Sequence, residues 1–141
     1  MIGATWSVDR SDQHRHLLIL AVAGAGVATV LAVVGLPPVD LHNPLHRAGI
    51  MDPGCGGTRA LRLAARGDIL GALSWNPASP VLLIGALGYI VRTIVGAATG
   101  RWLNARATWQ PRTYMILGCV AMVALEVRQQ GIASRLMRLG Y

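Results

Sequence analysis

Two cysteines and four histidines are the side chains of this chain best suited to metal binding or covalent chemistry. Cys55 lies in a glycine-rich turn, whereas Cys119 lies well inside an apolar run. A disulfide between them would require the turn to reach deep into that run, so we expect two unbridged thiols. His42 and His46 could supply two nitrogen ligands, but Pro44 breaks any helix that would align them, and zinc needs four ligands. The sequence therefore predicts no metal site and no cofactor.

Cys55 is also the side chain with the best chance of acting as a nucleophile. The reactive species is the thiolate, which would require Arg59, at the start of a predicted helix, to lower the pKa of the thiol. No histidine or second cysteine stands in the same motif. We therefore expect no catalytic residue and no enzyme activity, and loss of activity in a Cys55→Ser variant is the minimum observation for a thiol enzyme.

Arg92 and Glu126 are the only ionisable residues within the long apolar runs, and charges inside a membrane mark functional sites by default. Arg92 lies roughly 10 Å, and Glu126 roughly 20 Å, from the same face of the membrane at 1.5 Å per helical residue. The interpretation we favour is that Arg92 extends to the headgroups while Glu126 lies near the opposite interface beside Arg128. A buried pair or a proton path is the alternative.

The composition indicates whether the elements that position these residues lie in water or in a membrane. Apolar residues make up 53% of the 141 residues and charged residues only 13%, which is too few charges to cover a water-soluble domain of this size. Mean hydropathy is +0.47. This excludes most soluble enzymes and indicates a single all-α membrane domain. All thirteen basic residues are arginines spread along the chain, so we predict no nucleic-acid partner.

Three apolar runs predict about three transmembrane helices, each near the roughly 20 residues needed to cross the hydrocarbon core. The expected spans are 17–36, 81–99 and 113–130, of which the third has only fifteen strongly apolar residues before its polar end. A polar tail at 1–16, a loop at 100–112 and a tail at 131–141 complete the chain, and His14 and His16 are expected on the surface. The arginines divide seven to five between the two sides, which leaves the orientation undetermined.

The segment between the first two spans, 37–80, predicts an interfacial helical corner. Glycines around Cys55 form a turn, and Thr58 is placed to cap a short helix that ends at Arg66. Gly67 suits the position just after that helix, and Asp68 suits the cap of a second helix at 69–75. Three arginines share one face of the first helix and are expected to contact lipid headgroups or a partner: Arg59, Arg62 and Arg66.

Small residues recur where membrane helices could pack closely against one another. They are Gly24, Ala28 and Ala32 in the first span, and Gly96 and Gly100 at the end of the second. Such ladders permit close backbone approach in lipid, where packing replaces the hydrophobic effect as the driving force. Three thin helices bury little surface by themselves, which favours packing against another membrane protein.

The segment 52–77, DPGCGGTRALRLAARGDILGALSWNP, resembles the signature of a small bacterial membrane family, domain of unknown function 2752. The family pattern is close to C-P-x-C-G-x-T-R-A, a leucine-containing helix, G-D, an aromatic residue and N-P. The chain departs from it at Asp52, which replaces the first cysteine and so puts any dithiol or two-thiolate role in doubt. The matching residues are Pro53, Cys55, Gly56, Thr58, Arg59, Ala60, Gly67, Asp68, Asn76 and Pro77.

The resemblance implies a membrane protein and brings no established reaction. We expect a multi-pass protein of a bacterial plasma membrane, and the arginine-rich, lysine-free composition resembles that of actinobacterial proteins. The leading hypothesis is a non-enzymatic accessory subunit of a larger membrane complex, such as a respiratory supercomplex of the cytochrome bc and oxidase type. The alternative is a protein that binds anionic phospholipid or organises the membrane.

Overall fold

The computed structural model describes residues 4–36 and 49–138 and is mostly helical, with one small two-stranded sheet. The first part of the 37–80 segment, including the discounted metal ligands His42 and His46, lies outside the described residues. The elements are β1 (Ala4–Asp9), α1 (Leu17–Val33), α3 (Gly57–Ala65), α4 (Ile69–Trp75), α5 (Ala78–Thr99), β2 (Trp102–Ala107), α6 (Pro111–Gly131) and α7 (Ala133–Arg138).

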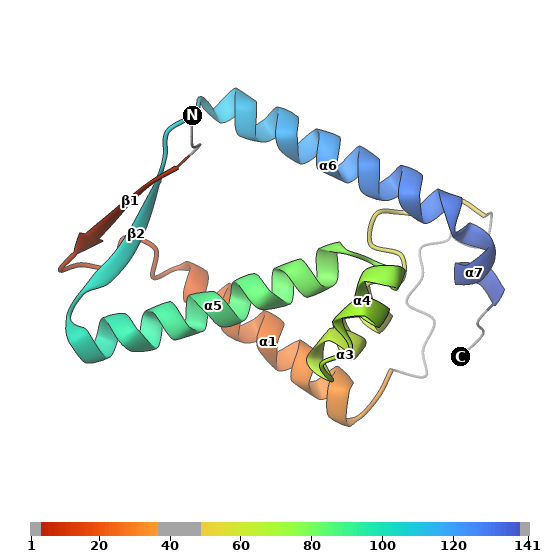
Figure 1. Cartoon of the computed structure of the whole chain (residues 1–141), viewed down its shortest axis with the longest axis horizontal. Helices are drawn as coiled ribbons and strands as arrows, with labels where there is room; N and C mark the ends of the chain where they lie inside the picture. The colour runs from red at the N-terminus through yellow and green to blue at the C-terminus, as the bar shows by residue number, and fades with distance from the viewer. Residues whose placement is uncertain (1–3, 37–48, 139–141) are drawn as a thin grey trace.

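Three long helices run between the same two ends of the molecule (Figure 1). The β1–β2 sheet lies at one end, and the short helices α3, α4 and α7 lie at the other. Helices α1 and α5 cross and pack against each other and against α3. Helix α6 stands apart from α1 and α5, and its main helix contact is with α7.

The buried core is small and rich in alanine. Its main cluster joins one residue of α1 with residues of α3, α4 and α5, namely Ala28, Ala60, Ala64, Ala72 and Leu83. Small side chains let the backbones of these helices approach closely, as helix packing in lipid requires. A second cluster of Met51, Cys55 and Leu136 attaches α7 to the turn before α3.

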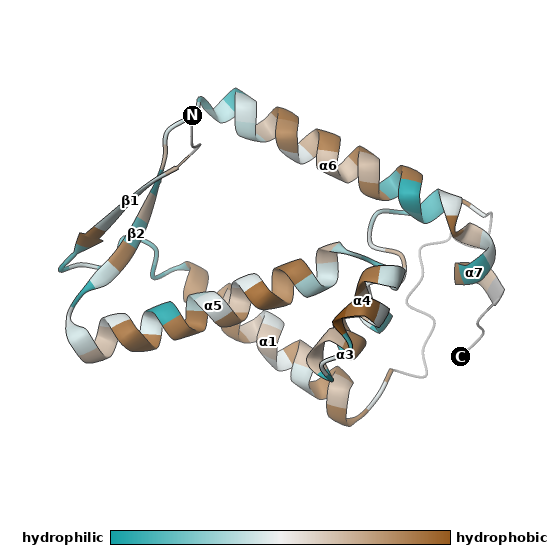
Figure 2. Cartoon of the chain, viewed as in Figure 1, coloured by the Kyte–Doolittle hydropathy of each residue, from teal (hydrophilic) through white to brown (hydrophobic). Residues whose placement is uncertain are grey.

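Among the described residues, α5 is the helix that is both long and apolar enough to cross a membrane, and this supports a membrane association of the chain. Helix α1 is apolar but has only 17 residues. Helix α6 has 21 residues, but both of its ends are polar (Figure 2). The expectation of three spans thus receives direct support from one helix.

The two-stranded sheet corrects the expectation of an all-α fold with a plain tail at 1–16 and a plain loop at 100–112. The strands pair antiparallel, from Ala4 opposite Ala107 to Asp9 opposite Trp102. Both strands alternate side chains between two faces, a pattern that favours strands, but each has only six residues. The pairing partners are more than ninety residues apart, so no local turn signal reveals them.

The helical corner forms almost as the sequence predicts. Helix α4 spans Ile69–Trp75, and the side chain of Asp68 accepts a hydrogen bond from the backbone N–H of Gly71 at 2.8 Å. Gly67 follows α3 with a φ of 88°, which glycine adopts at little cost. The prediction that Thr58 caps α3 is wrong, because the helix begins at Gly57 and its cap residue is Gly56, with a φ of 73°.

Candidate functional site

The Asn-Pro pair of the motif holds the turn before α3 against the start of α5. The Asn76 side chain is 1% exposed, and its Nδ2 donates to the carbonyls of Pro53 at 2.8 Å and Cys55 at 3.1 Å. Its Oδ1 accepts from the backbone N–H of Ala78 at 3.0 Å, in the first turn of α5. Every polar atom of this buried amide therefore has a backbone partner. Pro77 follows as the residue that precedes the first helical position of α5.

Cys55 is buried within this turn, and Asp52 shapes the turn around it. The backbone N–H of Asp52 donates to the Cys55 sulfur at 3.3 Å, and the Asp52 carboxylate accepts from the N–H of Gly54 at 2.7 Å. Burial raises the pKa of the Cys55 thiol, which is the opposite of what thiolate chemistry requires. Cys119 is exposed on α6, and no disulfide joins the two cysteines. Among the described residues, no cluster of three or more potential metal ligands forms.

The last turn of α6 docks on the carbonyl end of α4. Arg128 donates to the carbonyls of Leu73 at 2.8 Å and Ser74 at 3.1 Å, and the Gln129 Nε2 donates to the carbonyl of Trp75 at 3.1 Å. Gln130 exchanges hydrogen bonds with the backbone of residues 49 and 51. These contacts satisfy carbonyls that a helix end leaves without partners. From the sequence alone, these three residues were expected only at the polar end of the third span.

The three arginines expected to share one face of the first corner helix, Arg59, Arg62 and Arg66, have three different environments. The Arg59 guanidinium lies 5.1 Å from the centre of the Trp75 ring, whose neighbourhood also includes Arg135 at 4.2 Å. Arg66 donates twice to the carbonyl of Ala32, at 2.7 and 2.9 Å, and so binds the C-terminal end of α1. The Nε of Arg62 is buried with no hydrogen-bond partner among the described residues. The three residues thus do not present one uniform basic face to the surroundings.

The predicted packing residues also differ in their environments. Ala28 is buried in the main core, whereas Gly24 is exposed with nothing near its missing side chain. A Cβ at Gly96 would lie 2.4 Å from the Trp102 ring, so this glycine accommodates the strand β2 rather than another helix. Gly100 has a φ of 67° and terminates α5. The function of Gly96 and Gly100 is therefore to shape the junction of α5 with the sheet.

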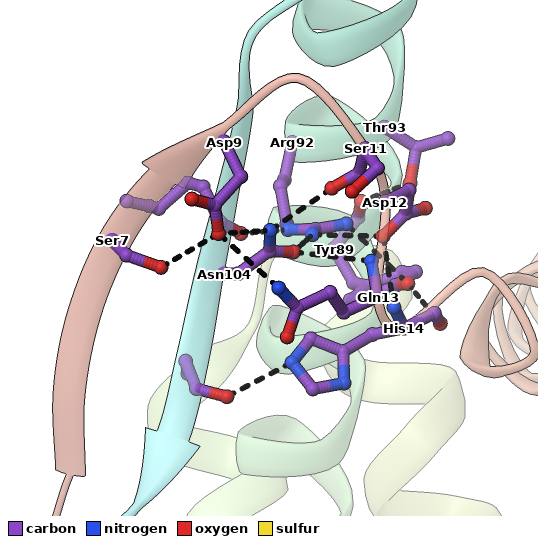
Figure 3. A network of polar contacts seen from close by, with 12 residues as sticks. Ser7, Asp9, Ser11, Asp12, Gln13, His14, Tyr89, Arg92, Thr93 and Asn104 are labelled. Atoms are coloured by element: carbon purple, nitrogen blue, oxygen red, sulfur yellow. Dashed lines mark hydrogen bonds and ion pairs between the residues drawn. The ribbon is translucent and has the colours of Figure 1, made fainter.

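Arg92 is the centre of a cluster of polar side chains from β1, the segment before α1, α5 and β2. We call this cluster the polar clasp, and its members are Asp9, Asp12, His14, Tyr89, Arg92 and Asn104 (Figure 3). The Arg92 Nη2 donates to Asp12 at 2.9 Å and to the Asn104 Oδ1 at 2.9 Å, and its Nε donates to the Leu103 carbonyl. The guanidinium also lies 5.1 Å from the Tyr89 ring centre. This differs from the alternative of a buried pair, since Arg92 binds Asp12 rather than Glu126, while the extension of Arg92 to the headgroups stays a prediction.

The remaining contacts of the polar clasp tie the N-terminal segment to the sheet. The fully buried Asn104 donates to Asp9 at 2.9 Å and to the Ser11 carbonyl at 3.0 Å. The His14 ring lies 2.9 Å from the carbonyl of Ala105, and the Tyr89 hydroxyl donates to the His14 carbonyl. His14 was expected on the surface but is partly buried here, and no role was predicted for the others, because polar residues in a tail and a loop give no sign of meeting at α5. Glu126, by contrast, is exposed on α6.

The two carboxylates of the clasp are held in their charged forms. The hydrogen bond from Asn104 is the main reason that the pKa of Asp9 is lowered, with Ser7 adding to it. Burial acts to raise the pKa of Asp12, but the hydrogen bonds from Arg92 and from the His14 backbone outweigh it and the pKa is lowered. At neutral pH both carboxylates of the clasp are consequently ionised: Arg92 neutralises Asp12, and neutral side chains donate hydrogen bonds to Asp9.

A family model described as protein of unknown function (DUF2752) matches residues 44–90. The match covers 47 of the 141 residues, from before the Cys55 turn to the middle of α5. It confirms the resemblance drawn from the motif. No curated protein and no solved structure matches the chain.

Proposed function

We propose that this chain is a non-enzymatic accessory subunit of a larger membrane protein complex in a bacterial plasma membrane. The observation that carries the proposal is the exposure of α6. Apolar side chains in the middle of this helix are exposed from Tyr114 to Val127. Its large exposed side chains are Tyr114, Met115, Ile116, Leu117, Val120, Met122, Val123 and Val127. Such a surface needs a cover of lipid or of another protein.

Three crossings of the membrane accord with the arrangement of the helices. At 1.5 Å per residue, α1, α5 and α6 are about 25, 33 and 31 Å long, close to the roughly 30 Å of the hydrocarbon core. All three join the end with the sheet to the end with the helical corner. We therefore place the sheet on one side of the membrane, and α3, α4 and α7 on the other.

A protein partner for α6 is favoured by how little of this helix the chain itself covers. Its last turn is fixed to α4 through Arg128 and Gln129, so the helix has a defined position beside the α1–α5 pair. Lipid alone would leave a rigidly anchored helix separated from the rest of its own bundle (Figure 1). A transmembrane helix of another subunit would fill that space by van der Waals packing.

A non-enzymatic role is supported by the contacts that the motif residues make within the protein. Asn76 binds backbone carbonyls and a backbone N–H, Asp68 caps a helix, and burial raises the pKa of the Cys55 thiol. The polar residues that define the resemblance thus stabilise the corner.

Purification in mild detergent tests the proposal. The tagged chain is recovered from its native membrane, and the eluate is analysed by mass spectrometry and haem absorbance. Stoichiometric recovery of other membrane subunits supports an accessory role, and haem in the eluate supports the narrower assignment to a cytochrome bc and oxidase supercomplex. Recovery of the chain alone with lipid contradicts both.

A matched pair of variants makes the test specific to α6. Gly118 on α6 and Gly85 on α5 are both exposed, and a Cβ at either position has nothing within 4 Å, so we expect tryptophan at either site to leave the chain's own packing intact. We expect Gly118→Trp to lose the co-purifying subunits while Gly85→Trp retains them. Equal retention by both variants contradicts α6 as the contact surface.

Arg62 supports the alternative function, binding of an anionic lipid. Its buried Nε has no partner among the described residues, and a lipid phosphate is an acceptor that arginine binds strongly. Lipid analysis of purified protein tests this function. Binding predicts that Arg62→Gln lowers the amount of anionic lipid bound per chain.

A further inference from the structure

The β1–β2 sheet has one polar face and one apolar face. Strand register places Ser7 opposite Asn104, and Asp9 opposite Trp102, on one face. The same register places Trp6 opposite Ala105, and Val8 opposite Leu103, on the other face. Side chains alternate strictly along a strand, so the two sets point in opposite directions. The sheet is therefore amphipathic across its thickness.

The polar face is the one that packs on α5. Trp102 lies against Gly96, Asn104 binds Arg92, and Asp9 binds Asn104. These contacts fix which way the sheet faces. In a domain surrounded by water the apolar face of a two-stranded sheet would pack on the helix and the polar face would be outside. Here the order is inverted.

The outer face is consequently apolar and uncovered. Trp6 is 65% exposed, Val8 is 64% exposed and Leu103 is 44% exposed. The sheet also lies beside the end of α5 rather than beyond it, because Arg92 and Gly96 belong to the last three turns of that helix. If α5 crosses the membrane, the sheet is held at the level of the lipid headgroups.

We propose that this outer face docks on the bilayer that surrounds the helices, at the interfacial depth of anionic phospholipid. The two strands have unpaired edges, which excludes the hydrocarbon core, and tryptophan prefers the interfacial region. The inference rests on the membrane location in the proposed function and is independent of a partner complex.

The charges around the sheet favour a lipid surface over a protein as the partner that covers its outer face. Arg92 neutralises Asp12 inside the polar clasp, whereas Asp9 is hydrogen-bonded to the neutral Asn104 and leaves one negative charge among the basic groups around the sheet. Five arginines at this end are exposed: Arg10, Arg15, Arg101, Arg106 and Arg112. A surface that combines exposed tryptophan with more arginines than carboxylates matches anionic headgroups, although Arg106 lies on the sheet face opposite Trp6.

Depth measurement with a label on each face of β1 tests the proposal. The full chain carrying Cys119→Ser receives one cysteine at Val8, on the outer face, or at Thr5, on the opposite face; Cys55 stays buried. Each variant carries an environment-sensitive fluorophore and is reconstituted into vesicles of phosphatidylcholine and phosphatidylglycerol. Nitroxide lipids with the quencher near the headgroup or deep in the chains report depth. A third variant, Gly85→Cys, reports the position of α5.

We expect the shallow quencher to act about twofold more strongly on the label at position 8 than on the label at position 5, as for an element lying in the interface. Equal weak quenching at 5 and 8, with strong deep quenching at 85, overturns the docking of the sheet and leaves the membrane location intact. Weak quenching at all three positions contradicts the membrane location itself. Loss of the difference when phosphatidylglycerol is omitted assigns the anionic headgroup as the attractive component.

Discussion

Arg92 of α5 donates to Asp12 at 2.9 Å, and this pair joins the end of a long apolar helix to the segment that leads into α1. The two residues are 80 positions apart in the sequence, and both side chains are largely shielded from solvent. A charge within an apolar run is thereby neutralised by the protein itself, so Arg92 need not extend to the headgroups.

Asp12→Asn is expected to loosen the N-terminal strand without dissociating the α1–α5 pair. The substitution removes the counter-ion of Arg92 but keeps a side chain of similar size. Hydrogen bonds to charged groups contribute roughly 1.5–3 kcal/mol, so protection of the β1 amides should fall by one to two orders of magnitude. Hydrogen exchange measured separately on β1 and α5 checks this. Ser11→Ala, beside Asp12 with an exposed side chain, is the control and should leave protection of β1 unchanged.

Acid is expected to release the same strand only at low pH. The pKa of Asp12 is lowered below its ordinary value of 3.8, so the folded state favours the charged form. The resulting stabilisation is fully present above about pH 4 and is lost as the pH falls through the lowered pKa. Exchange of the β1 amides, corrected for its intrinsic pH dependence, should be constant from about pH 8 to pH 5 and rise below pH 4. Release near pH 6 would instead assign control to a histidine.

How much of this fold the sequence predicts depends on whether the signal is local. Asp68 and Gly67 act on neighbouring backbone, and their roles at the two corner helices were predicted at the correct positions. The family resemblance likewise depends on one continuous segment. Thr58 shows the limit of such signals, because the helix starts two residues earlier than predicted, at Gly57 with Gly56 as its cap.

The parts that escaped prediction depend on contacts between distant segments. Asn104 and Asp9 lie in segments that look like a loop and a tail, and their buried pairing requires both strands to fold over α5. Arg128 looks like an interfacial charge, yet it binds the end of α4. In each case the deciding partner is more than fifty residues away, and periodicity along one segment carries no information about it.

Asn76→Ala is expected to destabilise the corner more than any other single truncation in the motif. It removes two hydrogen bonds to the carbonyls of Pro53 and Cys55 and one from the N–H of Ala78. A buried carbonyl left without a donor costs about 1–3 kcal/mol, so we expect a loss of several kcal/mol in total. Thermal unfolding in detergent, followed by circular dichroism, measures it. Ser79→Ala removes only one hydrogen bond, to the Gly57 carbonyl, and should cost about 1 kcal/mol.

Gly96→Ala is expected to displace the sheet from α5, although alanine is the better helix former. A Cβ at this position would lie 2.4 Å from the Trp102 ring, and the indole must move away for the helix to remain intact. Overpacking of this kind costs about 1–3 kcal/mol. A matched control is Gly88→Ala on the same helix, where nothing lies within 4 Å of the added atom, so helix propensity predicts a gain of up to about 1 kcal/mol.

The readout for this pair is the emission of Trp102, obtained as the difference between each variant and its Trp102→Phe derivative. Gly96→Ala should shift that emission and also raise exchange of the β2 amides, whereas Gly88→Ala should change neither. The two effects are linked because the Trp102 ring is one of the two contacts through which β2 rests on α5, the other being Arg92. Unchanged emission in Gly96→Ala would mean that the ring does not occupy the space beside the glycine. The inverted orientation of the sheet would then lose one of its two supports and depend on Arg92 alone.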